Sequence, residues 1–150
     1  MIDVEIISNY IPEYAHSTDA CVDLVGVECI KDNSDAQWFR TGVKVNIPDG
    51  YVGLVFARSS ISKKKLQLAN GVGVIDSGYT GEIQVRFNKT RDIHPSTKEY
   101  YELRELYYYN EGDRIAQMMI MPYPTINFVE VNEFSDNSIR GKDGFGSTGK

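Results

Sequence analysis

Residues 71–83 constrain the fold most, because they place chain-reversing residues between two apolar runs. Residues 72–75 predict one β-strand and residues 83–87 predict the next. Asp76, Ser77 and Gly78 lie between these runs and permit the backbone angles of a tight turn, so we expect the two strands to form a hairpin. A hairpin tip exposes backbone amides and carbonyls that can grip a flat hydrogen-bonding ring, and the Asp76 carboxylate beside them can act on a water.

Alternating and continuous apolar runs predict further strands along the chain. We expect strands in residues 2–7, 43–47, 51–57, 115–121 and 128–131, with 51–57 buried on both faces, and one short helix within residues 60–68. Many short strands separated by turn signals indicate an all-β barrel or sandwich. A length of 150 residues fits a single domain with a sizeable core.

Composition excludes several classes of protein. The net charge of −5 argues against stable binding to nucleic acid, which requires a basic face. We expect no membrane association, because no apolar run approaches the roughly 20 residues that cross a bilayer, and the acidic N-terminus does not resemble a targeting peptide. Cys21 and Cys29 form no Cys-x-x-Cys pair and the two histidines, His16 and His94, lie far apart, so a zinc site is not expected. Two inert thiols fit a reducing, cytoplasmic compartment.

Three segments carry candidate polar chemistry within the body of the chain. Arg58, Ser59 and Ser60 follow an apolar run and precede the expected helix, so they predict either an anion site or an ordinary helix cap with a surface arginine. Residues 63–65 are three lysines that either steer anions or form a solvated face. Asp23 either faces a cation through water or caps a turn, and Gln117 within an apolar strand is a binding residue or a satisfied buried amide.

The two remaining segments differ in composition from the body. Residues 138–150 are rich in glycine and predict a mobile C-terminal arm beyond a body of residues 1–137. Phe145 between glycines can stack on a planar base, although composition alone favours a disordered terminus. Residues 89–110 form a polar, tyrosine-rich excursion; it either packs its tyrosines on its own base or presents a surface to another subunit or a protein partner.

Five segments, taken in chain order, resemble the five motifs of the trimeric dUTPase family and cover nearly the whole chain except residues 89–110. They are Ala20-x-x-Asp23-Leu24, Gly53-Leu-Val-x-Ala57-Arg-Ser-Ser60, Gly73-Val-Ile-Asp-Ser-Gly-Tyr-x-Gly81-Glu, Gly112-Asp-Arg-Ile-Ala-Gln117 and Arg140-Gly-x-x-Gly-Phe-Gly-Ser-Thr-Gly149. Each motif alone is modest, and their order and spacing make the resemblance specific.

The resemblance implies a distorted jelly-roll or β-clip barrel that assembles as a homotrimer with three shared active sites. It implies hydrolysis of dUTP to dUMP and pyrophosphate with Mg²⁺, which keeps uracil out of DNA and supplies dUMP for dTMP synthesis. It also implies a cytoplasmic location, or the host cytoplasm for a viral protein.

Residue roles follow from the same motif positions. Asp76 matches the general base that activates water for attack on the α-phosphorus, and Tyr79 matches the aromatic beneath the deoxyribose. Asp23 matches a carboxylate that holds a metal-bound water. The remaining matches are substrate contacts: uracil recognition by Asn70, Val74 and Ile75; phosphate contacts by Arg58, Ser59, Ser60 and Gln117; and the arm residues Arg140, Phe145, Gly146, Ser147 and Thr148, of which Phe145 stacks on uracil.

This chain departs from the family pattern at three positions. Cys21 replaces the usual glycine and Asp143 adds a negative charge to the arm. Gln84, which we also expect to bind substrate, stands where a longer or basic side chain is common. Two alternatives stay open: a dCTP deaminase of the same fold, and a nucleotide-sensing protein that regulates a partner.

Overall fold

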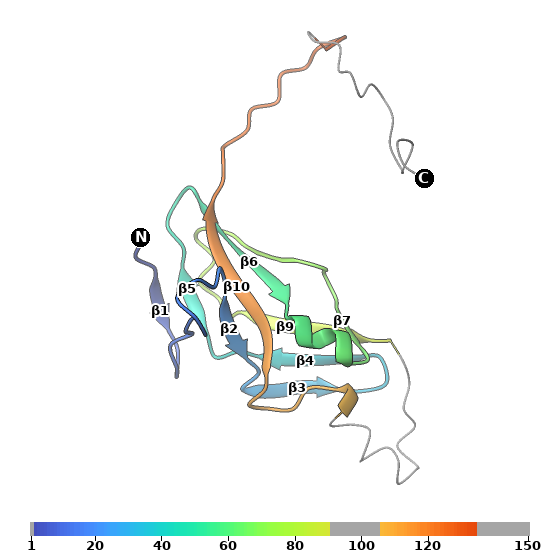
Figure 1. The fold of residues 1–150 in the computed structure, drawn as a ribbon. Coiled ribbons are helices and arrows are strands. Elements are labelled where there is room, and N and C mark those ends of the chain that lie inside the picture. Colours follow the sequence, from blue (N-terminus) through green and yellow to red (C-terminus); the bar gives the residue numbers. More distant parts are fainter. Residues whose placement is uncertain (1, 91–105, 135–150) are drawn as a thin grey trace.

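The computed structural model describes residues 2–90 and 106–134, and in this part of the chain it is an all-β jelly roll (Figure 1). Every strand pairing is antiparallel. The two-stranded sheet contains β1 (Glu5–Ile7) and β5 (Lys44–Asn46). The second sheet has the order β2 (Val22–Val25), β10 (Arg114–Pro122), β6 (Tyr51–Ala57), β8 (Gly73–Ile75), and the third has β3 (Glu28–Asp32), β4 (Ala36–Arg40), β9 (Gln84–Lys89), β7 (Leu66–Leu68).

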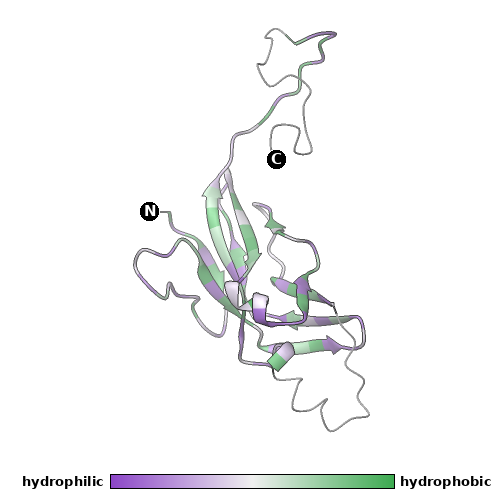
Figure 2. Ribbon diagram, turned by 45° about the vertical axis from the view of Figure 1, so that its right-hand side comes forward, coloured by the Kyte–Doolittle hydropathy of each residue, from purple (hydrophilic) through white to green (hydrophobic). Residues whose placement is uncertain are grey.

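The core lies between the two larger sheets and receives one face of each strand. Val85 and Phe87 of β9 are buried and alternate with exposed Gln84 and Arg86, as the sequence predicts. Figure 2 shows the same alternation of apolar and polar residues along the strands. The most completely buried apolar side chains include Leu24, Phe39, Val43, Phe87 and Ile115.

β6 is central to the second sheet and requires a glycine at its third residue. Its register with β10 runs from Tyr51 opposite Pro122 to Ala57 opposite Ala116. A Cβ at Gly53 would lie 2.8 Å from Ile47 Cδ1 and 3.1 Å from Ile75 Cβ. The absence of a side chain therefore lets β8 pack against β6 at this position. Gly53 and Val55 are buried and the alternate residues half-buried, so the second face is less covered than expected.

The hairpin expected between residues 72–75 and 83–87 is wrong. β8 pairs with β6 in the second sheet, whereas β9 pairs with β4 and β7 in the third. The turn itself is present, because the Tyr79 amide donates to the Asp76 carbonyl over 3.2 Å and Gly78 has a φ of 83°. Residues 76–82 thus carry the chain from one sheet to the other instead of closing a ladder.

Two further expectations need correction. The expected helix within 60–68 is a 3₁₀ turn, η1 (Ser59–Lys63), followed by strand β7. Residues 128–131, expected to be a strand, have no strand assignment and no partner within the described chain; Phe128 is 90% exposed. Figure 1 shows residues 123–134 extending away from the sheets beyond β10. The short strands β2, β3, β4 and β7 were not expected, because they lack long apolar alternation.

Two residues of the lysine run, Lys64 and Lys65, pack against the end of the tyrosine-rich region, whereas Lys63 is exposed. Lys64 donates to the Tyr108 carbonyl over 2.7 Å, and its ammonium lies 5.2 Å from the Tyr109 ring centre. Burial lowers the pKa of Lys64. Tyr108 and Tyr109 are buried core residues. Buried Gln37 bonds both backbone groups of Tyr109 at 3.0 Å, so this end of the excursion belongs to the body. Tyr100 and Tyr101 lie outside the described residues.

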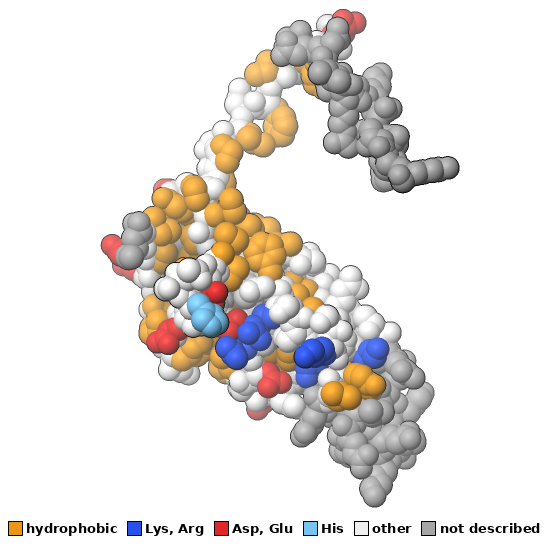
Figure 3. Space-filling model, viewed as in Figure 1, with side chains coloured by type: hydrophobic (Ala, Val, Ile, Leu, Met, Phe, Trp, Pro, Cys, Tyr) orange, Lys and Arg blue, Asp and Glu red, His pale blue; other side chains and the backbone are white. Residues whose placement is uncertain are grey.

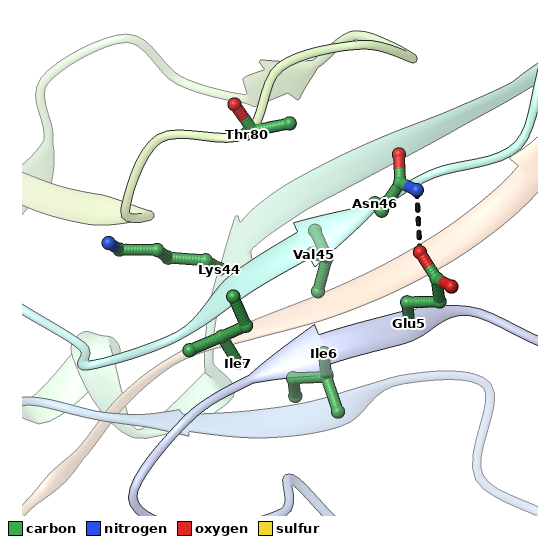
Figure 4. Close-up of a pocket in the computed structure, with 7 residues that line it drawn as sticks. All are labelled: Glu5, Ile6, Ile7, Lys44, Val45, Asn46 and Thr80. Atoms are coloured by element: carbon green, nitrogen blue, oxygen red, sulfur yellow. Dashed lines mark hydrogen bonds between the residues drawn. The ribbon is translucent and has the colours of Figure 1, made fainter.

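The two-stranded sheet borders a shallow apolar cavity of about 290 Å³, shown in Figure 4. Ile6 and Ile7 of β1 and Val45 of β5 line it, and Thr80 closes it from the 76–82 connection. Asn46 donates to Glu5 over 2.8 Å at its rim. In the described part of the chain, no helix is both long and apolar enough to cross a membrane.

An ion pair fixes the 76–82 connection to the rest of the fold. The Arg40 guanidinium donates to one oxygen of Glu82 over 2.8 Å, and the Gly42 amide donates to the other over 2.8 Å. The Glu82 side chain is only 10% exposed. Hydrogen bonding from Arg40, aided by the Gly42 amide, lowers the pKa of the Glu82 carboxyl. Next to it, the buried Thr41 hydroxyl donates to the Ile83 carbonyl over 2.6 Å.

Glu82→Gln is expected to lower the free energy of unfolding at pH 7 by about 1–3 kcal/mol, because a charge-assisted bond to a largely buried group is lost. A lowered folded-state pKa means that this stability is present above the unfolded carboxyl value of about 4.3 and disappears as pH falls through the folded value. Urea unfolding at several pH values and one protein concentration should show the two proteins converging in acid. Exposed Glu13→Gln is the control. A difference in stability that does not depend on pH would contradict this role of Glu82.

Candidate functional site

A cavity of about 380 Å³ opens between the second and third sheets; we call it the β7–β8 cavity. Leu68 at the end of β7, Ala69 after it and the three residues of β8 are part of its lining. Four residues that the sequence identifies for substrate contact line it together: Asn70, Val74, Ile75 and Gln84.

Two edge strands contribute to this lining, together with Gln84, Val85 and Arg86 of the inner strand β9. β7 is the last strand of its sheet and β8 is the last strand of the other, and each pairs with a single neighbour. An edge strand directs half of its backbone N–H and C=O groups away from its partner. The β7–β8 cavity therefore offers donors and acceptors from the main chain, with apolar side chains around them. Such a lining suits a flat ring with hydrogen-bonding edges.

Gly73 lines this cavity at a point where a side chain would crowd its neighbours. A Cβ at Gly73 would lie 3.1 Å from Val55 Cβ and 3.4 Å from Asn70 Nδ2. Both distances are close for a methyl group beside packed atoms. The glycine therefore leaves room between β6 and the Asn70 amide.

Asp76 follows β8 directly, and Tyr79 completes the turn that begins there. The Tyr79 hydroxyl donates to the Glu82 carbonyl over 3.1 Å, and the side chain is partly exposed. A Cβ at Gly81 would lie 2.5 Å from the Tyr79 hydroxyl oxygen and 2.6 Å from Cζ. The ring can occupy this position only because residue 81 is glycine. Gly81 thus fixes the place of the aromatic side chain.

A second cavity, of about 370 Å³, lies beside β2 and the end of β6; we call it the Arg58 cavity. Its lining unites three residues expected from the sequence, Asp23, Arg58 and Gln117. The Gln117 amide donates to the Ala57 carbonyl over 2.9 Å, which fixes the side chain across β6. Other lining residues are Ala15, His16, Asp19, Ala20 and Cys21.

Asp23 is held by two guanidinium groups. Arg58 approaches it with Nε at 2.6 Å from Oδ1 and Nη2 at 3.2 Å from Oδ2. Arg114 of β10 donates to Oδ2 over 3.1 Å. The Asp23 side chain is 18% exposed and that of Arg58 24% exposed. This two-point contact orients the Arg58 guanidinium at the cavity edge.

Ser59 and Ser60 begin the 3₁₀ turn immediately after Arg58. The Arg58 side chain provides no cap for this turn. The Ser59 carbonyl accepts from the Ser62 hydroxyl over 2.8 Å, and the Ser60 hydroxyl lies 3.4 Å from the Tyr109 hydroxyl. The first amides of such a turn have no acceptor within it, so they can meet an anion beside Arg58.

Neither cysteine is reactive in its described surroundings. Burial, reinforced by the Asp23 and Asp19 carboxylates, raises the pKa of the Cys21 thiol. Burial also raises the pKa of the Cys29 thiol, and the Asp32 carboxylate adds to this shift. Both residues are half-buried, and neither forms a disulfide.

The described residues fit a loosely held divalent cation rather than a dedicated metal cage. They contain no group of three or more His, Cys, Asp or Glu side chains arranged to hold a metal ion. Asp23 already accepts from two arginines, so its free lone pairs suit a water on a metal better than direct ligation. Mg²⁺ commonly retains waters and takes its other ligands from phosphate oxygens, which matches this donor set.

The sequence-derived site residues divide into two groups that line separate cavities. Asn70, Val74, Ile75 and Gln84 lie at the β7–β8 cavity, with Asp76 and Tyr79 on the connection that follows. Arg58, Asp23 and Gln117 lie at the Arg58 cavity. The arm residues Arg140, Phe145, Gly146, Ser147 and Thr148, together with Asp143 and the boundary at residue 137, lie outside the described residues.

The sequence assigned no role to His16 and Asp19, which line the Arg58 cavity, or to Arg114, which bonds Asp23. Arg114 belongs to one of the five motifs, but the sequence does not show that it bonds Asp23. That contact follows from the pairing of β2 with β10. His16 and Asp19 lie in a polar segment without periodicity, so no sequence pattern predicts that they line a cavity.

Comparison with known proteins places the chain within a family of enzymes. A sequence model of the dUTPase family matches residues 8–99 and 102–149. The deoxyuridine 5'-triphosphate nucleotidohydrolase of Leifsonia xyli is 37% identical over 150 residues, which covers 99% of this chain and 91% of that protein. The corresponding protein of Thermobifida fusca is 38% identical, with coverage of 93% and 72%.

Solved structures agree with this assignment. The dUTPase of Staphylococcus bacteriophage 80alpha, solved with dUPNHPP and described as controlling transfer of virulence genes, has a TM-score of 0.78 and 30% identity, with full coverage of both chains. A dUTPase mutant of phage phi11 of S. aureus, described with a structural Mg(II) ion, has a TM-score of 0.71 and 27% identity, covering 90% of this chain and all of that one. The motifs, the jelly roll and these relatives together show that the chain belongs to the dUTPase family of hydrolases.

Proposed function

We propose that this protein hydrolyses dUTP to dUMP and pyrophosphate in a Mg²⁺-dependent reaction. The observation that carries this proposal is the β7–β8 cavity of about 380 Å³, which is lined by Asn70, Gln84 and the three residues of β8 that directly precede Asp76. A pyrimidine base in the cavity would present its sugar and phosphates toward the connection that carries Asp76 and Tyr79.

Backbone groups explain how such a cavity selects uracil. Main-chain donors and acceptors keep fixed directions, and the amino group of cytosine reverses the donor and acceptor pattern at C4. Asn70 and Gln84 add side-chain amides at the rim. Tyr79, held in place by Gly81, would pack beneath the sugar and leave no space for a ribose 2′-hydroxyl.

Asp76 is the proposed general base. Its carboxylate takes a proton from a water that attacks the α-phosphorus, and the bond from that phosphorus to the bridging oxygen breaks. Arg58, Gln117 and the Ser59 and Ser60 amides bind phosphate oxygens. Mg²⁺, when bound to those oxygens, supplies charge neutralisation that makes pyrophosphate a better leaving group. Residues 138–150, with Phe145 on the base and Arg140 on the γ-phosphate, would close over the substrate.

A homotrimer with shared sites accounts for the division between two cavities. Catalysis requires the base-binding and phosphate-binding groups around one substrate, yet within one chain they line separate cavities. A neighbouring subunit can supply the missing half. The exposed apolar side chains of Ile126, Phe128 and Val129 also favour assembly, because isolated chains rarely expose such a series. We place the reaction in the cytoplasm, since two free thiols suit a reducing compartment.

Product analysis with Mg²⁺ and, separately, dUTP, dCTP, dTTP and UTP is the direct test. We expect dUMP and pyrophosphate from dUTP alone. Asp76→Asn should reduce kcat by about 10²–10⁴-fold because the base is lost, while binding of dUpNHpp changes little. Ammonia from dCTP would establish a deaminase instead. Binding without turnover in the unsubstituted protein would establish a regulatory binder.

Gly81→Ala should impair sugar discrimination without unfolding the protein, because the atoms in its way belong to the end of a movable side chain. We expect the ratio of kcat/KM for dUTP over UTP to fall by roughly tenfold as Tyr79 is displaced. Kinetics with both nucleotides and thermal unfolding measure the two effects. Ser77→Ala in the same connection is the control and should leave the ratio unchanged; an unaltered ratio in Gly81→Ala would reject the role of Tyr79.

Shared sites predict complementation between inactive variants. Arg58→Ala removes a phosphate-binding group, and Asp76→Asn removes the general base. In a mixed trimer, one subunit can supply an intact Arg58 and its neighbour an intact Asp76, so the site between them is complete. With random co-assembly of equal amounts, about a quarter of all sites should regain activity, which is about one site in three within each mixed trimer that carries both tags. Co-expression with two affinity tags, followed by tandem purification and kinetics, measures this. The separately purified variants, mixed without subunit exchange, should regain nothing; equal inactivity after co-assembly would place each site within one chain.

A further inference from the structure

The Arg58 cavity contains a histidine to which neither the motifs nor the proposed function gives a role. His16 lines this cavity together with Arg58 and Gln117, and its side chain is 79% exposed. His16 is the one histidine within the described residues, and Figure 3 shows histidine lying beside acidic and basic side chains on one face of the molecule. The imidazole is therefore accessible to a ligand that enters the cavity.

A compact turn holds this imidazole in place through Asp19. The Asp19 amide donates to the His16 carbonyl over 3.0 Å, and the His16 amide donates to Asp19 Oδ2 over 2.9 Å. The same carboxylate oxygen lies 3.3 Å from His16 Nδ1. A carboxylate only accepts, so Nδ1 carries a proton in this contact. The other ring nitrogen, Nε2, remains for a ligand.

The cavity lining carries two carboxylates and one guanidinium close to His16. The charged side chains of the lining, besides His16, are the carboxylates of Asp19 and Asp23 and the guanidinium of Arg58; the remaining titratable group, the Cys21 thiol, is neutral. Arg58 and Arg114 both contact Asp23, whereas Asp19 contacts His16. A polyphosphate thus meets a lining whose fixed cation is already paired. A protonated imidazole at His16 would add an unpaired donor and a positive charge to this lining.

We propose that His16 is a substrate-binding residue that takes up a proton from solvent when a polyphosphate enters the Arg58 cavity. Nδ1–H donates to Asp19, and Nε2–H donates to a phosphate oxygen. No bond of the ligand breaks in this step. The inference deepens the proposed function, on which the identity of the ligand as a nucleoside triphosphate rests. It assigns the phosphate end of the site a cation that depends on pH.

Calorimetric titration with dUpNHpp and Mg²⁺ at pH 7.5 tests this directly. Comparing binding enthalpies in two buffers of different ionisation enthalpy gives the number of protons taken up. The unsubstituted protein should take up more protons than His16→Gln, by a fraction approaching one. His16→Gln should bind roughly two- to tenfold more weakly, as expected for an exposed charge-assisted bond.

Matched variants and ligands separate charge from structure. His16→Lys carries a permanent charge, so it should retain affinity without the additional proton uptake. His94→Gln alters the other histidine and should behave as the unsubstituted protein. With dUMP, which lacks the pyrophosphate group, His16→Gln and the unsubstituted protein should bind equally well.

Inorganic pyrophosphate as a second ligand distinguishes the two proposals. Linked proton uptake with pyrophosphate but no binding of dUpNHpp would reject the proposed function and retain the role of His16. Equal proton uptake and affinity in the unsubstituted protein and His16→Gln, with both ligands, would overturn the inference and leave the proposed function intact. Failure to bind either ligand would overturn both.

Discussion

The separation of β7 and β8 into different sheets is the constraint on which the candidate site depends. Each strand has a partner on one side only, so backbone groups on the other side border a gap instead of a neighbour. Had β8 joined β9 in a hairpin, those groups would have bonded each other and the gap would be filled. Gly53 permits the close packing of β8 on β6, and Gly73 leaves room beside Asn70. Arg40 and Glu82 then fix the connection that carries Asp76 and Tyr79.

How far the sequence predicts this fold follows from the kind of signal each segment carries. β6 and β9 show long apolar runs or strict alternation, and β6 was expected with its observed bounds. Strands such as β7, with three residues, carry too little periodicity to be distinguished from the end of a helix. The partner of β8 could not be predicted, because a turn sequence such as Asp76-Ser77-Gly78 specifies that the chain reverses but not which strand it meets. That choice is made by packing in the core, where Ile75 lies against the position of Gly53.

The contacts between charged side chains were harder to predict than which residues belong to the candidate site. The motifs single out Asp23 and Arg58 separately, whereas the fold joins them at 2.6 Å and adds Arg114 to the same carboxylate. An arginine expected for phosphate is therefore oriented by the carboxylate expected near the metal. Such a contact preorganises the guanidinium, and it also means that Arg58 carries little uncompensated charge. The phosphates of a bound substrate therefore need further positive charge. In the proposed site, Mg²⁺ and His16 supply it.

Under the proposed function, a single chain is an incomplete unit for hydrolysis of dUTP. The base-side and phosphate-side residues line separate cavities, and the segment after β10 exposes apolar side chains along its length. Both observations have one explanation if the surfaces that remain uncovered in the isolated chain become interfaces between copies. Stability and activity would then be coupled, because the contacts that cover Phe128 would also bring two cavities around one substrate. Dilution that separates subunits should consequently abolish catalysis before it unfolds the two larger sheets, whose hydrogen bonds lie within one chain.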